Sequence, residues 1–583
     1  MIRKLARSIR QYKRDTILTP LSMTLEVIME VLLPIIMADL IDNGISAGNS
    51  AVIWRDGLLL AGVSILSLLS GLLGGVFGAR ASSGFARNLR HDMYYRLQDY
   101  SFSNIDKFST SSLITRLTTD VSNVQNAFQM LIRMAARSPL MLIFSGIMAF
   151  RVNARLALIF LCVVPFLAVG LTYVATHAHP VFRKVFKTYD SLNNVVQENV
   201  RGMRVVKSFV REDYEDKKFE DISGQVCTLF TKAERIIALN SPLMQFAMYA
   251  CTLLISWFGA KFILSSVGQP NAMTTGELNS LLTYSMQILG SLMMLSFMFV
   301  MLTISRASGE RICEVLDEQS DLHSPENARK EIPDGSVDFN GVSFSYAGNK
   351  KRLCLENVNL HIHSGETIGI VGGTGSSKST LVQLIPRLYD ATEGVVKVGG
   401  HDVKEYDLEA LRNSVAMVLQ KNVLFSGTIR ENLRWGNPDA TDEELVAASR
   451  LAQAHEFIEG FPQGYDTFIE QGGSNVSGGQ KQRLCIARAI LKKPKILILD
   501  DSTSAVDTRT DALIREGMKK IIPGTTTFII AQRMSSVMDA DKIIVLDGGR
   551  VNGFGTHDEL MQTNEIYREV YTSQTKGGGD YDE

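Results

Sequence analysis

The chain has little cysteine and almost no net charge. Its 583 residues include six cysteines, and 60 Lys and Arg stand against 61 Asp and Glu, which gives a formal net charge of -1. Six cysteines without a C-x-x-C pair are too few for a disulfide scaffold and form no zinc or redox motif. The balanced charge excludes a protein that binds nucleic acid through charge alone. The composition, with 45% hydrophobic and 21% charged residues, also excludes intrinsic disorder.

Long apolar runs occur in the first half of the chain and end before Arg306. A membrane-spanning helix needs about 20 apolar residues, and no run after Arg306 is that long. We therefore predict a transmembrane domain over residues 16–305. Its six expected helices cover roughly residues 16–42, 57–79, 126–150, 154–176, 240–265 and 278–304.

Loop charge predicts the orientation of these helices. Residues 1–15 contain six basic residues and one acidic residue, whereas segment 43–56 has Arg55 as its only basic residue and segment 265–277 has none. Because cytoplasmic loops carry the excess of Lys and Arg, we expect both termini in the cytoplasm. Residues 1–15 are expected to form an elbow helix on the membrane surface, and no cleaved signal peptide is predicted.

The second half has a different pattern. A polar linker is predicted over 306–335, and short apolar strands alternate with helices over 336–572, which is typical of an α/β domain. The tail over 573–583 is polar and Gly-rich, and we expect it to be disordered. The predicted fold is an all-α six-helix transmembrane domain with long intracellular helices, followed by an α/β domain.

A phosphate-binding loop follows an apolar strand at GIVGGTGSSKST, residues 369–380. Its backbone N–H groups can surround phosphates, Lys378 can reach the β- and γ-phosphates, and Ser379 can bind Mg²⁺. Ser377 stands where the motif G-x-x-x-x-G-K-[ST] has its last glycine; we expect a harmless change unless this backbone needs a positive φ. The remaining loop residues of the predicted ATP site are Gly372, Gly373, Thr374, Gly375, Ser376 and Thr380.

A buried strand is predicted at KILILDD, residues 495–501, and it ends in two carboxylates. This is the Walker B pattern. Asp500 at the carboxyl end of the strand can reach Mg²⁺, while the apolar residues before it belong to the core of a parallel sheet.

The segment NVSGGQKQR, residues 475–483, precedes this strand and resembles the signature motif of ABC (ATP-binding cassette) ATPases. The other motifs of that family occur in order. The resemblance implies that Tyr346 stacks on adenine, that Gln420 is the Q-loop ligand of Mg²⁺ and water, and that Gln532 occupies the place of the switch histidine. It also implies a signature formed by Val476, Ser477, Gly478, Gly479 and Gln480, and a D-loop formed by Ser504, Ala505, Val506 and Asp507.

The first half resembles the transmembrane domain of type I exporters (type IV). Segments 116–124 (RLTTDVSNV) and 196–212 (VQENVRGMRVVKSFVRE) are similar to the family's long intracellular loops. The resemblance implies coupling helices that dock on the ATPase domains, the second on the partner's domain. One transmembrane domain followed by one ATPase domain is a half-transporter, and the family works as dimers.

The sequence departs from the family pattern at the predicted hydrolytic site. The family has Glu after the Walker B Asp, as the base that positions water, and this chain has the shorter Asp501. A displacement of about 1 Å in such a group can cost on the order of 10²-fold in rate. Gln532 cannot carry the positive charge of a histidine, and Gln471 replaces an acidic residue upstream of the signature. The signature itself is intact apart from Val476 in place of Leu.

This combination resembles the degenerate-site subunit of bacterial heterodimeric multidrug exporters. It implies that the chain binds ATP and Mg²⁺ at a hydrolysis-impaired site. The signature would then serve the site of a homologous half-transporter with a Walker B Glu and a switch His, in the bacterial cytoplasmic membrane. Two alternatives stay open: a homodimeric exporter that uses Asp501 as its base, and a regulatory or channel-like protein gated by ATP without hydrolysis.

Polar residues inside membrane spans are candidates for substrate contacts. Glu26 and Glu30 lie on one face of the first span, where they can meet cationic drugs or pair with a neighbouring helix. Arg133 and Arg137 in the third span are expected to snorkel or to pair between helices. Flexible methionines suit promiscuous binding of hydrophobic drugs or lipids, although ordinary packing is the alternative. The methionine candidates are Met244, Met248, Met286, Met293, Met294 and Met298.

Overall fold

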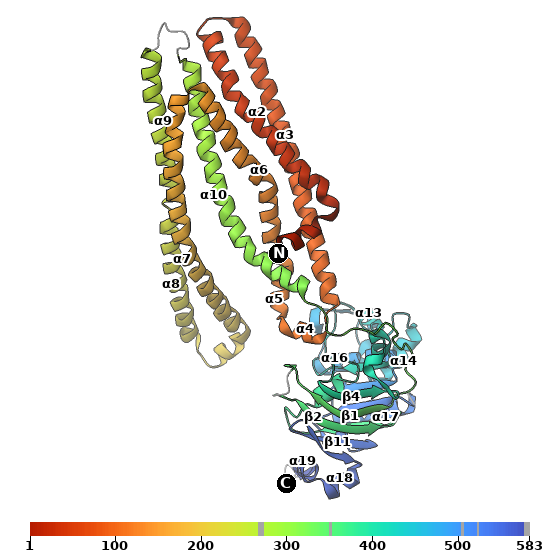
Figure 1. Ribbon diagram of the computed structural model, residues 1–583. Helices are drawn as coiled ribbons and strands as arrows, with labels where there is room; N and C mark the ends of the chain where they lie inside the picture. Colours follow the sequence, from red (N-terminus) through yellow and green to blue (C-terminus); the bar gives the residue numbers. More distant parts are fainter. Residues whose placement is uncertain (266–272, 349–351, 503–505, 522–523, 577–583) are drawn as a thin grey trace. The chain divides into compact units, whose positions relative to one another are not determined.

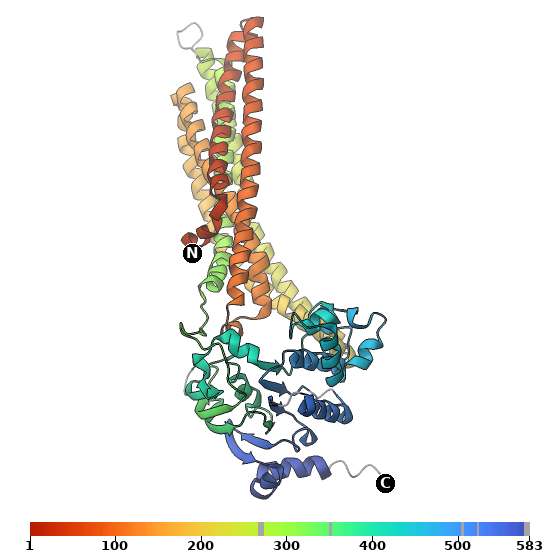
Figure 2. The same ribbon diagram turned by 90° about the vertical axis from the view of Figure 1, so that its right-hand side faces the viewer.

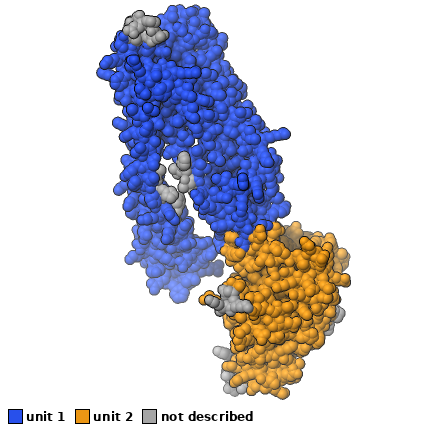
Figure 3. Space-filling model, in the orientation of Figure 1, with its two compact units in different colours: residues 1–98, 109–318 blue, residues 99–108, 319–583 orange. Residues whose placement is uncertain are grey.

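The computed structural model describes residues 1–265, 273–348, 352–502, 506–521 and 524–576. The chain forms two compact units, which Figure 3 shows in different colours. Unit 1 comprises residues 1–98 and 109–318, and unit 2 comprises residues 99–108 and 319–583. Segment 99–108, which lies within the predicted transmembrane domain, thus belongs to the unit that contains the ATPase motifs.

Unit 1 is helical (Figure 1). Six of its described helices are long and apolar enough to cross a membrane, which confirms the predicted all-α transmembrane fold. Many of their large apolar side chains are exposed, as lipid-facing residues are. Its elements are α1 (Ile2–Leu5), η1 (Ala6–Tyr12), α2 (Lys13–Asp39), η2 (Leu40–Ile45), α3 (Ser50–Gln98), α5 (Thr110–Thr115), η3 (Arg116–Asp120), α6 (Val121–Val152), α7 (Ala154–Ser208), α8 (Glu212–Ile237), α9 (Asn240–Ser265) and α10 (Thr275–Asp317).

The N-terminal residues differ from the expected single elbow helix. The backbone breaks at Arg10, where φ is 43°, and α2 begins at Lys13. Short α1 and the 3-10 helix η1 precede it. A residue with this backbone conformation interrupts the helical hydrogen-bond pattern, so the chain changes direction within residues 1–15.

Unit 1 is held together by helix contacts near both ends of α10. Tyr284 is fully buried, and its hydroxyl donates to the Val31 carbonyl of α2 at 2.8 Å. Toward the other end of α10, Arg311 pairs with Asp120 of η3 through two nitrogens, and the Asp120 side chain is fully buried. A buried carboxylate requires such a partner.

Unit 2 contains the predicted α/β domain and confirms that part of the fold. Its six-stranded sheet has the order β12-β11-β3-β10-β9-β6, and all neighbours except β12 and β11 are parallel. A four-stranded antiparallel sheet has the order β2-β1-β4-β5. The strands are β1 (Val337–Phe344), β2 (Leu355–Ile362), β3 (Thr367–Val371), β4 (Glu393–Val398), β5 (His401–Asp402), β6 (Val415–Val418), β7 (Gly427–Thr428), β8 (Phe468–Ile469), β9 (Ile496–Asp500), β10 (Thr526–Ile530), β11 (Lys542–Asp547) and β12 (Arg550–Gly555).

Helices cover the sheets, and two of them follow the last strand. Figure 2 shows α18 and α19 beside one another, close to the C-terminus. The helices of unit 2 are α4 (Phe102–Lys107), α11 (Lys378–Gln383), α12 (Leu408–Ser414), α13 (Ile429–Arg434), α14 (Asp442–Leu451), α15 (His455–Glu459), α16 (Gly478–Leu491), α17 (Thr508–Ile521), α18 (His557–Thr563) and α19 (Glu565–Lys576), with 3-10 turns η4 (Val403–Glu405), η5 (Gly464–Asp466), η6 (Gln471–Gly473) and η7 (Met534–Ser536).

Candidate functional site

The predicted nucleotide residues gather where the parallel strands β3, β9 and β10 end. The phosphate-binding loop follows β3, Asp500 ends β9, and Gln532 follows β10. These strands are hydrogen-bonded in parallel register, so their carboxyl ends lie at one edge of the sheet. This is the edge at which open α/β sheets bind ligands.

The loop after β3 has a backbone that demands glycine. Gly372 has a φ of 155°, and a Cβ added there would lie 2.2 Å from the Leu546 carbonyl oxygen. Gly375 has a φ of 82°. A Cβ added at Gly373 would meet open space. Ser376 is buried, and its N–H donates to the Gly373 carbonyl. The loop therefore presents backbone amides at the start of α11 rather than side chains.

Ser377 corrects the expectation of a harmless change. Its φ is 70° and its ψ is 26°, which is the left-handed region, and its side chain makes no capping hydrogen bond to α11. A residue with a Cβ pays about 1–2 kcal/mol for this conformation. The missing glycine is thus a strained position in this loop, at the residue just before Lys378.

Lys378 lies inside the loop. Its Nζ donates to the carbonyls of Gly372 and Gly373, each at 2.8 Å. Burial lowers the pKa of Lys378, while the charges of Asp500 and Asp501 oppose that change. A phosphate chain would supply the acceptors that a half-buried ammonium needs.

Ser379 and Asp500 provide oxygen ligands for a hard cation. The Ser379 hydroxyl donates to Asp500 Oδ1 at 3.0 Å, although 121 residues separate the two in sequence. Burial raises the pKa of Asp500, and the negative charge of Asp501 adds to that effect. Mg²⁺ prefers one or two protein oxygens together with phosphate oxygens and water, so this pair fits the ion. Bound Mg²⁺ would neutralise the phosphate charge that develops during hydrolysis.

Asp501 accepts hydrogen bonds from two amide side chains. Gln532 Nε2 lies 3.0 Å and Gln420 Nε2 lies 3.4 Å from Asp501 Oδ2. Asp501 has a φ of 47°, a conformation that Asp tolerates better than most residues. Burial raises the pKa of Asp501, and the two amides oppose that change. The predicted base position, Q-loop and switch position therefore meet at one carboxylate.

Tyr346 lies at the predicted adenine position beside the start of α11. Its ring is half exposed, and its hydroxyl lies 3.0 Å from Thr380 Oγ1 and 3.2 Å from Gln383 Oε1. An exposed aromatic face fixed by hydrogen bonds at its edge can stack on a base. Gln383 is a contact that motif spacing did not identify.

A second tyrosine links Tyr346 to segment 99–108 of the same unit. Tyr389 lies edge-on to Tyr346 with ring centroids 5.2 Å apart, and its hydroxyl donates to Asp106 of α4 at 2.7 Å. Burial and the Asp106 carboxylate raise the pKa of Tyr389. Sequence reasoning missed this contact, because 283 residues separate its partners.

The signature residues form the start of α16. Ser477 caps this helix: its Oγ accepts from Gln480 N–H, and Gln480 Oε1 accepts from Ser477 N–H at 2.9 Å. Ser477 and Gly478 are exposed, Gly479 and Gln480 are half-buried, and Val476 packs against the core. The start of this 14-residue helix is thus exposed at Ser477 and Gly478, and a helix N-terminus suits an anion.

The D-loop is described in part. Ser504 and Ala505 lie outside the described residues. Val506 is buried and its carbonyl accepts from Arg533 Nη1 at 2.9 Å, while Asp507 Oδ1 accepts from Thr510 N–H at 2.9 Å. The second half of the D-loop is therefore tied to the segment that carries Gln532.

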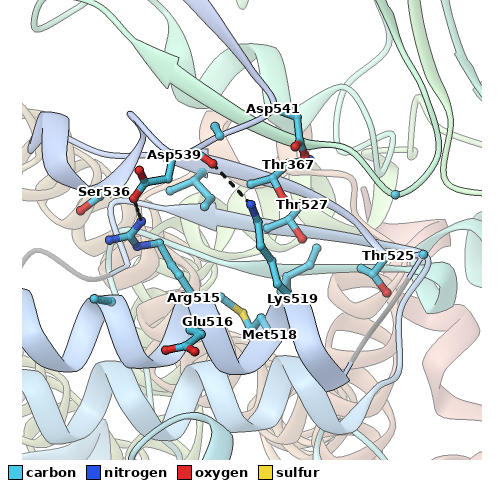
Figure 4. Close-up of a pocket in the computed structure, with 16 residues that line it drawn as sticks. Thr367, Arg515, Glu516, Met518, Lys519, Thr525, Thr527, Ser536, Asp539 and Asp541 are labelled. Carbon is cyan, nitrogen blue, oxygen red and sulfur yellow. Dashed lines mark hydrogen bonds and ion pairs between the residues drawn. The ribbon is translucent and has the colours of Figure 1, made fainter. Parts of the chain in front are cut away.

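Unit 2 also contains a cavity of about 490 Å³ whose lining includes none of the predicted ATP-site residues. Figure 4 shows Thr367 and Thr527 among its lining residues, together with Arg515 and Lys519 of α17. Thr367 and Thr527 lie at the amino ends of β3 and β10, away from the predicted nucleotide edge. Arg515 contacts Asp539 Oδ2 at 3.5 Å, and Lys519 contacts the Asp539 carbonyl at 3.4 Å. Its basic groups are thus engaged with protein oxygens.

In unit 1, the two candidate glutamates share one guanidinium. Arg137 of α6 lies 2.8 Å from Glu30 Oε1 and 3.4 Å from Glu26 Oε1 of α2. Gln287 Nε2 of α10 donates to the Glu30 carbonyl at 3.2 Å. A Cβ on Gly71 of α3 would lie 3.1 Å from Glu26 Cδ, so the glycine leaves room for this carboxylate. Of the alternatives for these residues, the structure shows interhelical pairing.

The candidate methionines do not form one surface. Met244 and Met248 of α9 are half-buried and pack against the core of unit 1. Met298 of α10 is buried, whereas Met286, Met293 and Met294 of α10 are exposed. Three of the six are thus buried or packed against the core, as ordinary core residues are.

These features define a class: a multi-pass membrane protein with one ATP-binding domain of the P-loop type. Comparison with known proteins identifies the family. The ABC transporter transmembrane region matches residues 16–292, and the ABC transporter domain matches residues 355–504. The chain is 37% identical over 552 residues to the uncharacterized ABC transporter ATP-binding protein YfiB of Bacillus subtilis (strain 168), which covers 95% of each chain. It is 35% identical over 576 residues to MT1311, another such uncharacterized protein, of Mycobacterium tuberculosis (strain CDC 1551 / Oshkosh), covering 98% of each.

The chain therefore belongs to the ABC transporter family and is a half-transporter. A solved structure of a bacterial Atm1-family ABC exporter with ATP bound has the same fold, with a TM-score of 0.80, 24% sequence identity and coverage of 97% of this chain and 98% of that chain. The ATP-binding domain implies ATPase activity, and exporters of this fold work as dimers of half-transporters in a lipid membrane.

Proposed function

We propose that this half-transporter is the degenerate-site subunit of a heterodimeric exporter. It binds ATP and Mg²⁺ at its own site, hydrolyses ATP there slowly or not at all, and supplies its signature to the catalytic site of a homologous partner. The observation that carries this proposal is the contact of Gln532 Nε2 with Asp501 Oδ2 at 3.0 Å. A neutral amide occupies the switch position and is directed at a shortened base.

This contact opposes hydrolysis for two physical reasons. A general base must lie within about 2.6–3.2 Å of the proton that it removes, and Asp501 is one methylene shorter than the family's Glu. The carboxylate oxygen that would accept this proton already accepts from Gln532 and lies near Gln420. A neutral glutamine also provides no positive charge to stabilise the transferred phosphoryl group.

The signature of this chain supports its role toward a partner. Ser477 caps α16, and Ser477 and Gly478 at the start of that helix are exposed. A signature is useful only opposite a competent ATP site. The partner is therefore a homologous half-transporter with a Walker B Glu and a switch His.

The transported compounds belong to the hydrophobic and amphipathic class, drugs or lipids, and move outward across the bacterial cytoplasmic membrane with both termini in the cytoplasm. Glu26 and Glu30 lie on α2 with Arg137 as their counter-ion. A cationic amphiphile can compete with Arg137 for these carboxylates. Exposed methionines on α10, among them Met293 and Met294, offer adaptable apolar contacts.

The test is the ATPase activity of the purified full chain, alone and with the homologous half-transporter. We expect little turnover from the chain alone and drug-stimulated turnover from the pair. Ser477→Arg in this chain should abolish turnover of the pair, whereas the same change in the partner's signature should leave most of it.

Other outcomes contradict the proposal. Vigorous turnover by the chain alone would support a homodimer that uses Asp501 as its base. Ion conductance that depends on ATP, without turnover by the pair, would support an ATP-gated channel-like protein.

A further inference from the structure

The last helix of the chain contacts the segment that carries Gln532. Gln574 of α19 donates from Nε2 to the Gln532 carbonyl at 2.8 Å, and its Oε1 accepts from the Met534 N–H at 2.8 Å. One side-chain amide thus pairs with the backbone on both sides of Arg533. This two-bond pattern fixes the direction of the backbone in the same way that a neighbouring strand would.

Helix α19, which carries Gln574, is anchored by packing and hydrogen bonds. Tyr567 of α19 is fully buried, its hydroxyl lies 2.7 Å from His557 Nδ1 of α18, and its N–H donates to Asn564 Oδ1 at 2.9 Å. Val570 and Tyr571 pack against the same core that contains Tyr567. Gln574 therefore projects from a helix that is held in place by packing.

The backbone segment that Gln574 contacts, residues 532–534, leads to the nucleotide site. Met534 is buried in the core, and Arg533 Nη1 donates to the Val506 carbonyl at 2.9 Å. The Gln532 carbonyl accepts from Gln574 Nε2, and the Gln532 side-chain Nε2 donates to Asp501 Oδ2. A backbone held on both sides of Arg533 limits the directions in which the Gln532 side chain can point.

We propose that Gln574 is a positioning residue for the switch segment: by bridging residues 532 and 534 it holds the Gln532 amide at Asp501, where the γ-phosphate of ATP is sensed. The C-terminal helix α19 is then a built-in support of this subunit's ATP site. This inference rests on the proposed function, in which Gln532 occupies the switch position at the phosphoryl group that ATP transfers, its γ-phosphate.

The proposal predicts an effect that depends on the γ-phosphate. If Gln574 acts through Gln532, its loss weakens ATP binding and leaves ADP binding unchanged, because ADP lacks the group that Gln532 senses. Two neutral hydrogen bonds are removed, and part of that loss appears as a reduction of about 3- to 10-fold in ATP affinity. A general loss of structure would weaken both nucleotides.

The experiment uses the full chain in lipid nanodiscs, with Mg²⁺ and the fluorescent probes mant-ATP and mant-ADP. Gln574→Ala should lower mant-ATP affinity about 3- to 10-fold without changing mant-ADP affinity. Gln574→Glu keeps the acceptor for Met534 but places a carboxylate against the Gln532 carbonyl, so its effect should be at least as large. Gln562→Ala, an exposed glutamine on neighbouring α18, is the matched control and should change neither affinity.

A double-variant comparison decides whether Gln574 acts through Gln532. In a Gln532→Ala background, Gln574→Ala should have no further effect on the ratio of the two affinities. An undiminished effect in that background, or equal losses for mant-ATP and mant-ADP, would overturn the inference. Vigorous ATPase turnover by the chain alone would refute the degenerate-site proposal instead. The ratio of mant-ATP to mant-ADP affinity would still test whether Gln574 positions Gln532.

Discussion

The contact between Asp501 and Gln532 makes a specific prediction about restoring hydrolysis. We consider the double variant Asp501→Glu with Gln532→His, which replaces both residues by those of the family pattern. The added methylene moves the carboxylate toward the attacking water, and the histidine can bear charge beside the γ-phosphate. In the parent, the amide and the carboxylate satisfy each other at 3.0 Å.

The size of the effect follows from the geometry. Moving the base by about 1 Å is worth on the order of 10²-fold in rate when the rest of the site is in place. At a φ of 47°, Glu has a backbone cost of about 1 kcal/mol, and Asp tolerates this conformation better. That cost reduces the expected gain in rate about fivefold. Asp501→Glu alone also meets the unchanged Gln532 amide, so we expect less than a tenfold gain. The double variant should gain on the order of 10-fold or more, and the two changes should be strongly non-additive.

The assay is phosphate release by the heterodimer whose partner site has been silenced by Glu→Gln at the partner's Walker B. Gln471→Glu is the control, because it restores a family residue outside the Asp501 contact and should give no gain. An unchanged rate for the double variant, in a heterodimer that still binds ATP at this site, would refute the reasoning.

Three further predictions concern binding and stability. Gly372→Ala should abolish ATP binding in a fluorescent-nucleotide assay, because the new Cβ would lie 2.2 Å from the Leu546 carbonyl oxygen at a φ of 155°; retained affinity would contradict the loop geometry. Asp120→Ala should lower the midpoint of thermal unfolding in detergent, since it removes the hydrogen-bonded partner of the partly exposed Arg311, a loss of about 1.5–3 kcal/mol; an unchanged midpoint would show that the pair is not stabilising. Burial raises the pKa of Asp500, so the Asp500 carboxyl holds its proton more readily in the folded state than in the unfolded state. The contribution of Asp500 to stability therefore falls as the pH rises from about 4. Without Mg²⁺, Asp500→Asn should therefore unfold at a higher temperature than the parent at pH 7, and the difference should shrink toward pH 4.

The large-scale fold was predictable because strong physical constraints act on local sequence. A bilayer fixes the length of a spanning helix, so the apolar runs of α2, α3 and α6 could be placed from composition alone. Buried parallel strands are short apolar runs, which is why β9 was recognisable before Asp500. In each case the signal lies within the segment that forms the element.

Features that depend on distant contacts were not predictable in the same way. The strain at Ser377 arises from the turn that connects β3 to α11, and the sequence shows the missing glycine but not the sign of φ. The hydrogen bond between Tyr389 and Asp106 joins residues 283 positions apart, and Gln574 contacts a backbone 42 residues earlier in the sequence. No local periodicity encodes such contacts, because they are set by how separate elements pack.

The site also changes how its two unusual residues should be interpreted. In sequence, Asp501 and Gln532 are two separate departures from the family, and either could be reverted by itself. In the structure they are the acceptor and donor of one hydrogen bond, so each residue is part of the other's environment. The Gln532 amide gives the buried Asp501 carboxylate a donor that offsets part of its desolvation. A single reversion breaks this pair without assembling the family's site. In the degenerate site that we propose, loss of hydrolysis is therefore a coupled state of these two residues, and their joint replacement tests this coupling.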